Sequence, residues 1–212
     1  DLEAYSLQQM NNSNSGYSVW KSPESSAQAV VKTTQSERKV QKLDMVKLKQ
    51  VEVAPDLTLI GEKYVAKQSV NVRYTPGVKS NNKVGGIRQG GEFTAVGKTT
   101  NNWILVAQSG VTVGYVSGNP KFVGPATQQI TSMQEDVGFD LDSLDDAQTA
   151  QVASGIDLDG ISLDAGGLDL DQVEIAVETD CRQVSYDVKS EKGSGESKFQ
   201  ACKSLDGSWS IS

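Results

Sequence analysis

Residues 61–123 consist of short runs in which apolar and polar side chains alternate, and this two-residue period predicts β-strands. The runs KYVAKQSVNVRY, KVGGIRQGGEFTAVGKT, NNWILVAQSG and VTVGYVS follow one another at the spacing of about 8–12 residues that small antiparallel sheets show. Between them lie residues that tolerate the left-handed backbone of tight turns, namely Gly90-Gly91, Asn101-Asn102 and Gly110. We therefore expect a small antiparallel barrel at 61–123.

The last stretch, 177–212, returns to the same period. The runs VEIAVETDCRQVSYDVKS and KFQACKSLDGSWSIS flank the turn-forming EKGSGES, and this arrangement predicts a β-hairpin. The sequence from Asp206 to Trp209 predicts a second tight turn, which would fold Trp209 back onto the hairpin.

The pattern of residues 1–60 is mixed. MNNSNSGYS is typical of a loop, whereas Ser22-Pro23-Glu24 combines an N-cap, a proline at the first helical position and an acidic first turn. Apolar residues follow at a weakly helical spacing: Ala27, Val30, Val31, Val40, Leu43 and Val46. The stretch MVKLKQVEVAP fits a strand instead, and Pro55 would end either element. We expect an N-terminal region that is partly helical or extended.

Charge separates the segment at 124–176 from the rest of the chain. Between Phe122 and Cys181 there are 14 acidic residues and no Lys or Arg, whereas the remainder carries 20 basic and 13 acidic residues. The near-repeats FDLDSLDD, IDLDGISLD and LDLDQ place Leu or Ile between aspartates. We predict an acidic, Asp/Leu-rich linker whose residues 126–172 lack an independent core. Docking on a basic partner, or on the chain's own basic residues, is the alternative.

Missing residue types exclude several kinds of chemistry. Histidine is absent, which removes the usual general base of hydrolases and the commonest transition-metal ligand. Neither acidic repeat places a Gly at the sixth and a Glu at the twelfth position of an EF-hand loop. We therefore expect no metal, no cofactor and no enzymatic activity.

Two cysteines, Cys181 and Cys202, both lie in the C-terminal stretch. They occupy corresponding places on the two arms of the predicted hairpin, so a cross-strand disulfide is consistent with the pattern. Two free thiols in a cytosolic protein are the alternative. A metal site is disfavoured because two thiolates leave a tetrahedral zinc site unfilled.

Residues 65–123 resemble the bacterial Src-homology-3 domain of envelope proteins. The markers are VNVRYTPG, KVGGIRQGGEFTAVG, NNWILV and VGYVSGN, in the family's order. The resemblance implies a small barrel of five to six strands that binds or positions a ligand without chemistry. The chain departs from the family at Tyr74-Thr75, where members usually carry a Ser-Gly pair. The candidate ligand-binding residues are Asn71, Arg73, Tyr74 and Trp103.

Residues 177–212 resemble the C-terminal module of the seventeen-kilodalton surface antigens and related outer-membrane lipoproteins. The shared features are Cys181-Arg182, a hairpin, Cys202 after Ala201, and Asp-Gly-Ser-Trp. The family's upstream Gly-rich, membrane-associating stretch is missing. The resemblance implies an envelope location and supports the Cys181–Cys202 disulfide.

These expectations give a mainly β protein: an N-terminal region (1–60), an SH3-like barrel (61–123), an acidic linker (124–176) and a disulfide-stapled hairpin module (177–212). We expect a periplasmic, outer-membrane-associated or surface protein of a Gram-negative bacterium. Its partner would be peptidoglycan or another envelope glycan, or else an envelope protein complex that it serves as a scaffold or accessory subunit, docking through its N-terminal and acidic segments. We expect no nucleic-acid partner, because the basic residues do not cluster. The apolar runs are too short for a transmembrane segment, and a lipid anchor, if there is one, would belong to the precursor only.

Overall fold

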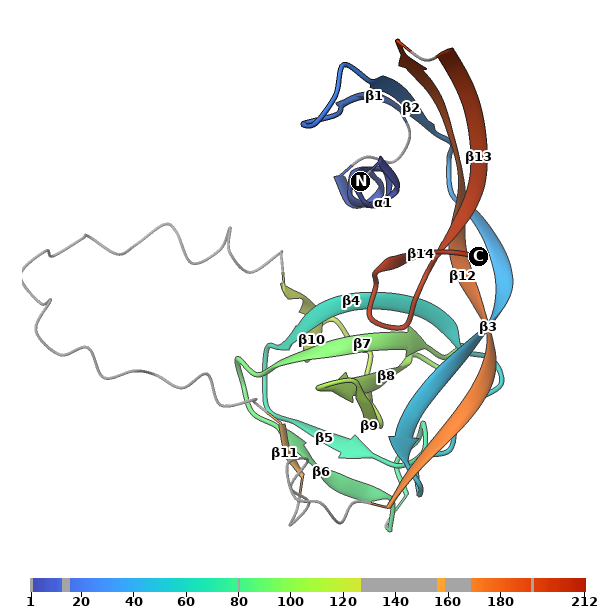
Figure 1. Cartoon of the computed structure of the whole chain (residues 1–212). Coiled ribbons are helices and arrows are strands. Elements are labelled where there is room, and N and C mark those ends of the chain that lie inside the picture. Colours follow the sequence, from blue (N-terminus) through green and yellow to red (C-terminus); the bar gives the residue numbers. More distant parts are fainter. Residues whose placement is uncertain (1, 13–15, 80, 127–155, 159–168, 192) are drawn as a thin grey trace, which may run out of the picture. The chain divides into compact units, whose positions relative to one another are not determined.

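A computed structural model describes residues 2–12, 16–79, 81–126, 156–158, 169–191 and 193–212. The protein is mainly β: the described part of the chain contains fourteen strands and one helix (Figure 1). It divides into two compact units. Unit 1 comprises Asp1–Leu43 and Ile175–Ser212, and unit 2 comprises Asp44–Glu174.

Unit 1 is an antiparallel sheet with a helix on one face. Its elements are α1 (Leu2–Asn12), β1 (Gly16–Lys21), β2 (Gln28–Thr33), β13 (Gly193–Lys203), β14 (Trp209–Ile211) and parts of β3 (Glu37–Leu48) and β12 (Leu170–Ser190). The strand order is β1-β2-β12-β13-β14, and α1 lies against it (Figure 1).

The core of unit 1 lies between α1 and the sheet. It contains Met10, Val31, Val184, Ala201 and Trp209, which are all at most 8% exposed. Every second residue of a strand points to the same face, so these residues gather from four strands under the helix. The hairpin of β12 and β13 therefore buries its apolar residues against α1, β2 and β14.

The helix predicted from Ser22 is wrong. Residues 23–26 form bends, and residues 28–33 form strand β2 with alternate buried side chains. The serines that resemble a helix cap instead stabilise the loop after β1: the Glu24 amide donates to the Ser22 hydroxyl at 3.2 Å, and the Ala27 amide donates to the Ser25 hydroxyl at 3.3 Å. Serine favours helix caps and such turns by the same local hydrogen bond. The helix of the described residues is α1, whose last three residues belong to MNNSNSGYS, the stretch expected to be a loop.

The predicted C-terminal hairpin and its disulfide are confirmed. Cys181 and Cys202 are directly opposite each other on β12 and β13, and they are bonded. The turn at Asp206 is also present, because the Ser208 amide donates to the Asp206 carboxylate at 2.9 Å. It returns the chain as β14, so that Trp209 enters the core.

Unit 2 contains the predicted strand series. Its strands are β4 (Thr58–Ala66), β5 (Val70–Arg73), β6 (Lys83–Ile87), β7 (Glu92–Lys98), β8 (Trp103–Gln108), β9 (Val111–Ser117), β10 (Val123–Pro125) and β11 (Ile156–Leu158). They follow one another in space as β10-β4-β7-β8-β9-β5-β6-β11, with antiparallel neighbours. The end of β3 pairs with β9 in parallel.

The interior of unit 2 is tightly packed around β9. Phe93, Leu105 and Tyr115 are at most 1% exposed. Gly114 has φ 148°, and a Cβ there would lie 2.5 Å from the Arg73 carbonyl oxygen. Only glycine therefore allows β5 to approach β9 this closely.

The expected linker at 124–176 includes residues that pair with unit 2. Ile156–Leu158 forms β11 on the edge of β6. Near the other end, the Lys49 amide donates to the Asp169 carbonyl at 2.9 Å, and the Lys49 ammonium lies 3.1 Å from the Asp169 carboxylate. Lys47, which is 8% exposed, lies 3.7 Å from Asp171. The first acidic repeat, FDLDSLDD, and most of 126–172 lie outside the described residues.

Within the described ranges, α1 has 11 residues and is too short and too polar to cross a bilayer.

Candidate functional site

The loop between β5 and β6 in unit 2 is organised by one buried side chain, Asn82, which is 7% exposed. Its carbonyl oxygen accepts a hydrogen bond from Arg73 Nη1 at 2.8 Å. Its amide nitrogen donates to the Thr75 hydroxyl at 2.8 Å and to the Gly77 carbonyl at 2.7 Å. Arg73 therefore holds the loop together through Asn82.

Tyr74 is the first residue of this loop, and its backbone is fixed on both sides. Its amide donates to the Asn82 carbonyl at 2.8 Å, and its carbonyl accepts from the Glu52 amide at 3.2 Å. The residue as a whole is half-buried. The phenol ring is thus attached to a backbone that has little freedom left to lose on binding.

Trp103 begins β8, directly after a turn that contacts the same loop. The Asn101 side-chain amide donates to the Pro76 carbonyl at 3.2 Å, which joins the turn to the loop. Within the turn, Asn102 has φ 66°, and the Trp103 amide donates to the Thr99 hydroxyl at 3.0 Å. Trp103 is half-buried, like Tyr74. The structure thus brings the segments of these two candidate residues together.

Asp56 fixes the turn from its other side. Its carboxylate accepts hydrogen bonds from the Thr100 hydroxyl and, at 2.9 Å, from the Thr100 amide. These bonds, the hydroxyl's first, lower the pKa of Asp56 from its ordinary value. The carboxylate is therefore ionised at neutral pH, and it stabilises the turn through its two hydrogen bonds to Thr100.

Asn71 lies apart from the other candidates. It is exposed on β5 and lines a hollow of about 250 Å³ together with Lys83 and Arg88. Arg73, Tyr74 and Trp103 do not line this hollow. Arg73, Tyr74 and Trp103 therefore belong to one surface, which we call the loop surface, and Asn71 lies outside it.

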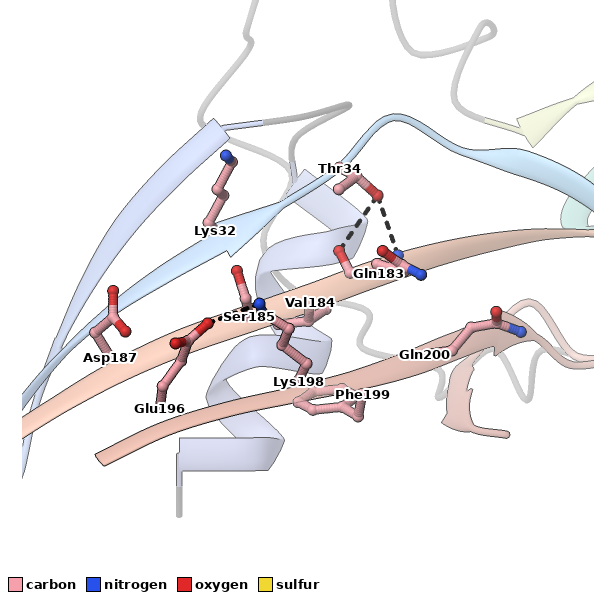
Figure 2. A pocket seen from close by; sticks show the side chains of 10 residues that line it. All are labelled: Lys32, Thr34, Gln183, Val184, Ser185, Asp187, Glu196, Lys198, Phe199 and Gln200. Carbon is pink, nitrogen blue, oxygen red and sulfur yellow. Dashed lines mark hydrogen bonds and ion pairs between the residues drawn. The ribbon is translucent and has the colours of Figure 1, made fainter.

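A second surface, in unit 1, was not predicted. The side chains of β1, β2, β12 and β13 that point away from α1 form what we call the outer face. A groove of about 610 Å³ follows it, with Lys32, Asp187, Glu196 and Lys198 along its sides (Figure 2). The alternation in β12 and β13 could have indicated part of this face. The whole face could not be recognised, because residues 28–33, which form β2, were expected to be helical.

The charged groups of the groove lie in two neighbouring rows. Lys32, Ser185 and Lys198 are directly opposite one another on β2, β12 and β13, and Asp187 and Glu196 form the next pair. Lys198 lies 2.8 Å from Glu196, and both side chains are more than half exposed. Their hydrogen bond lowers the pKa of Glu196 and raises the pKa of Lys198, so both groups are charged at neutral pH.

Neither surface has the arrangement of a metal centre. In the part of the chain that the structure describes, no three Cys, Asp or Glu side chains are grouped to hold a metal ion.

Neither a protein-family model, nor a curated protein, nor a solved structure matches the chain.

Proposed function

We propose that the chain is a non-enzymatic binding protein of the cell envelope that holds cell-wall material or another glycan on the loop surface of unit 2. The observation that carries this proposal is the fixed backbone of Tyr74 beside the Trp103 turn. Aromatic rings stack on the apolar faces of sugars, and the polar groups of a fixed loop supply hydrogen bonds. A loop that is already ordered also loses little entropy on binding.

The sequence markers support an SH3-like module in unit 2. VNVR forms β5, WILV opens β8, and VGYVS ends β9. We infer in the same way that the C-terminal hairpin is a module of the surface-antigen type, from Cys181-Arg182 and the Asp-Gly-Ser-Trp turn.

Several ionisable groups of the described residues stabilise the fold, and this use of them fits a binding role. Asp56 and Asp206 accept hydrogen bonds within turns, and Tyr115 is buried. The Cys181–Cys202 disulfide supports an extracytoplasmic location, because disulfides persist in oxidising compartments.

The test is co-sedimentation of the purified chain with peptidoglycan sacculi. We expect the wild type to pellet with the sacculi, Tyr74→Ala to stay in the supernatant, and Tyr74→Phe, which keeps the ring, to pellet. Tyr17→Ala, which removes an exposed ring from unit 1, is the matched control and should pellet. Equal pelleting of the Tyr74→Ala variant would show that the loop surface is not the contact. A wild type that binds neither sacculi nor soluble envelope glycans would show that the ligand is not an envelope glycan.

A second function is a scaffold or accessory subunit of an envelope assembly that docks through its N-terminal and acidic segments. The observation that favours it is the exposure of Tyr17 and Val19 on β1, at 73% and 57%. Co-purification of a stoichiometric envelope protein with the wild type, lost on substitution of these two residues, would distinguish it from glycan binding.

A further inference from the structure

The outer face of unit 1 exposes large apolar side chains at one corner. Tyr17, Val19 and Val30 are 73%, 57% and 44% exposed. Val19 and Val30 are directly opposite each other on β1 and β2, and Tyr17 is opposite Lys32. A sheet face with its apolar residues in water is typical of a surface that another protein covers.

The same face carries two adjacent rows of opposite charge, each running across four strands. The basic row is Tyr17, Lys32, Ser185 and Lys198, and the acidic row is Val19, Val30, Asp187 and Glu196. Each row begins with an apolar residue on β1 and ends with a charge on β13. Figure 2 shows the charged members on neighbouring strands. The rows are two residues apart along each strand, about 6.6 Å.

We propose that a second copy of this chain packs on this face, outer face against outer face. The two-fold axis would run between the two rows, parallel to them. Rotation about this axis places the basic row of each copy over the acidic row of the other. Lys198 then faces the second copy's Glu196, Ser185 faces its Asp187, and Tyr17 faces its Val19. Every such contact occurs twice, as an isologous interface requires.

Charge complementarity selects a second copy over other occupants. Lys32 and Lys198 balance Asp187 and Glu196, so a polyanion or a polycation would meet as much repulsion as attraction. A partner with the same two rows in reversed order places Glu196 opposite Lys198 and Asp187 opposite Ser185, and it sets Val30 against the aliphatic stem of Lys32. The rotated outer face of this chain has that order.

The extent of the face suits a modest interface. Neighbouring strands lie about 4.8 Å apart and rise about 3.3 Å per residue. Since β12 and β13 pair over ten residues and β1 and β2 over six, the four strands cover roughly 500 Å² per copy in projection. Two copies would bury about 1,000 Å², the lower limit for a specific interface. The groove of about 610 Å³ adds area, because Ser185 is short and leaves room between the two lysines for the second copy's Asp187. A micromolar dissociation constant is expected for so small an interface.

The experiment is sedimentation equilibrium of the full chain across the micromolar range, on charge-reversed variants. We expect a wild-type dimer. Lys198→Glu brings four carboxylates together at the interface and should raise the dissociation constant at least about tenfold, as like charges at an interface do. Combining Glu196→Lys with Lys198→Glu exchanges the charges within each copy, and this variant should recover dimerisation. The Lys121→Glu variant, with the same charge change on unit 2, should dimerise like the wild type.

Two results would overturn the proposal. One is a wild type that stays monomeric at the highest concentration. The other is a dimer that Lys198→Glu leaves intact, or that the exchanged variant does not restore. Both side chains are exposed, and the thermal midpoint of each variant checks that it folds. The inference is independent of glycan binding, because Tyr74→Ala lies in unit 2 and should leave the dimer unchanged.

Discussion

The guanidinium group of Arg182 lies over the indole ring of Trp209, 4.9 Å from its centroid. Its Nη1 also donates to the Met10 carbonyl, in the last turn of α1, at 3.2 Å. One side chain, 8% exposed, therefore joins β12 to β14 and to the helix. A cation suits a helix C-terminus, where the carbonyl groups lack helical partners.

Arg182→Ala should lower the free energy of unfolding of unit 1 by about 2–4 kcal/mol, since it removes a buried cation–π contact and a charged hydrogen bond. Chemical denaturation followed by tryptophan fluorescence measures this loss. Arg182→Lys keeps the charge but not the planar group, so it should recover only part of the stability. Full recovery by lysine would show that charge alone is needed.

The disulfide should stabilise unit 1 selectively. The Cys181→Ser/Cys202→Ser variant should lose about 3 kcal/mol of unfolding free energy, the amount expected for closing a loop of about 20 residues. Hydrogen exchange should show lower protection in β12 and β13, while the strands of unit 2 keep theirs. Alkylation of the denatured, unreduced wild type should modify neither cysteine, and modification of both would contradict the bond.

Tyr115 makes stability depend on pH in the alkaline range. Its hydroxyl donates to the Glu52 carbonyl at 2.8 Å and accepts from the Ala54 amide at 3.0 Å. Burial, the largest cause, raises the pKa of Tyr115 to about 12. Since this lies above the unfolded value of about 10, the neutral phenol stabilises the fold fully below pH 10 and less as the pH rises toward 12.

Tyr115→Phe should therefore cost about 1–3 kcal/mol at neutral pH, because two partly buried hydrogen bonds to the backbone are lost. The difference in unfolding free energy between this variant and the wild type should shrink above pH 10. Denaturation at a series of pH values measures it. A difference that stays constant to pH 12 would mean that the phenol does not titrate as inferred.

Asn82 should control the order of the loop surface. Asn82→Ala removes four side-chain hydrogen bonds, which join Asn82 to Arg73, Thr75, Gly77 and the Lys79 amide. We therefore expect faster amide exchange at residues 74–79 and a stability loss of about 2–3 kcal/mol. If a fixed loop is needed for glycan binding, this variant should pellet with sacculi as poorly as Tyr74→Ala does. Asn71→Ala, on β5 but outside this network, is the control and should bind normally.

Local patterns predicted most strands, because the strands of unit 2 are short alternating or apolar runs that end at turns whose chemistry is local. Asn102, with φ 66°, and Gly110, with φ 81°, are where the sequence places turns. The hairpin and the Cys181–Cys202 pairing could be predicted for the same reason. The helix could not, because α1 has little amphipathic pattern of its own and is stabilised by packing on a sheet that is distant in sequence.

The candidate site was predicted less completely. VNVRYTPG indicates where the loop lies, but the partner of Arg73 is Asn82, and nothing in the spacing singles out that residue. The outer face depends on β2 pairing with β12. A local reading of Ser22-Pro23-Glu24 favours a helix there, and only the long-range pairing overrides it.

The pairing of β2 with β12 also bears on the order in which the protein is made. Thr34 and Gln183, hydrogen-bonded at the end of β2, are 149 positions apart, and all of unit 2 lies between them. On a ribosome, unit 2 can fold while β1 and β2 still wait for the strand that completes their sheet. Its folding also shortens the loop that this pairing must close, which lowers the entropy cost. Variants that slow the folding of unit 2 should therefore prolong the time during which β1 and β2 are exposed to chaperones and proteases.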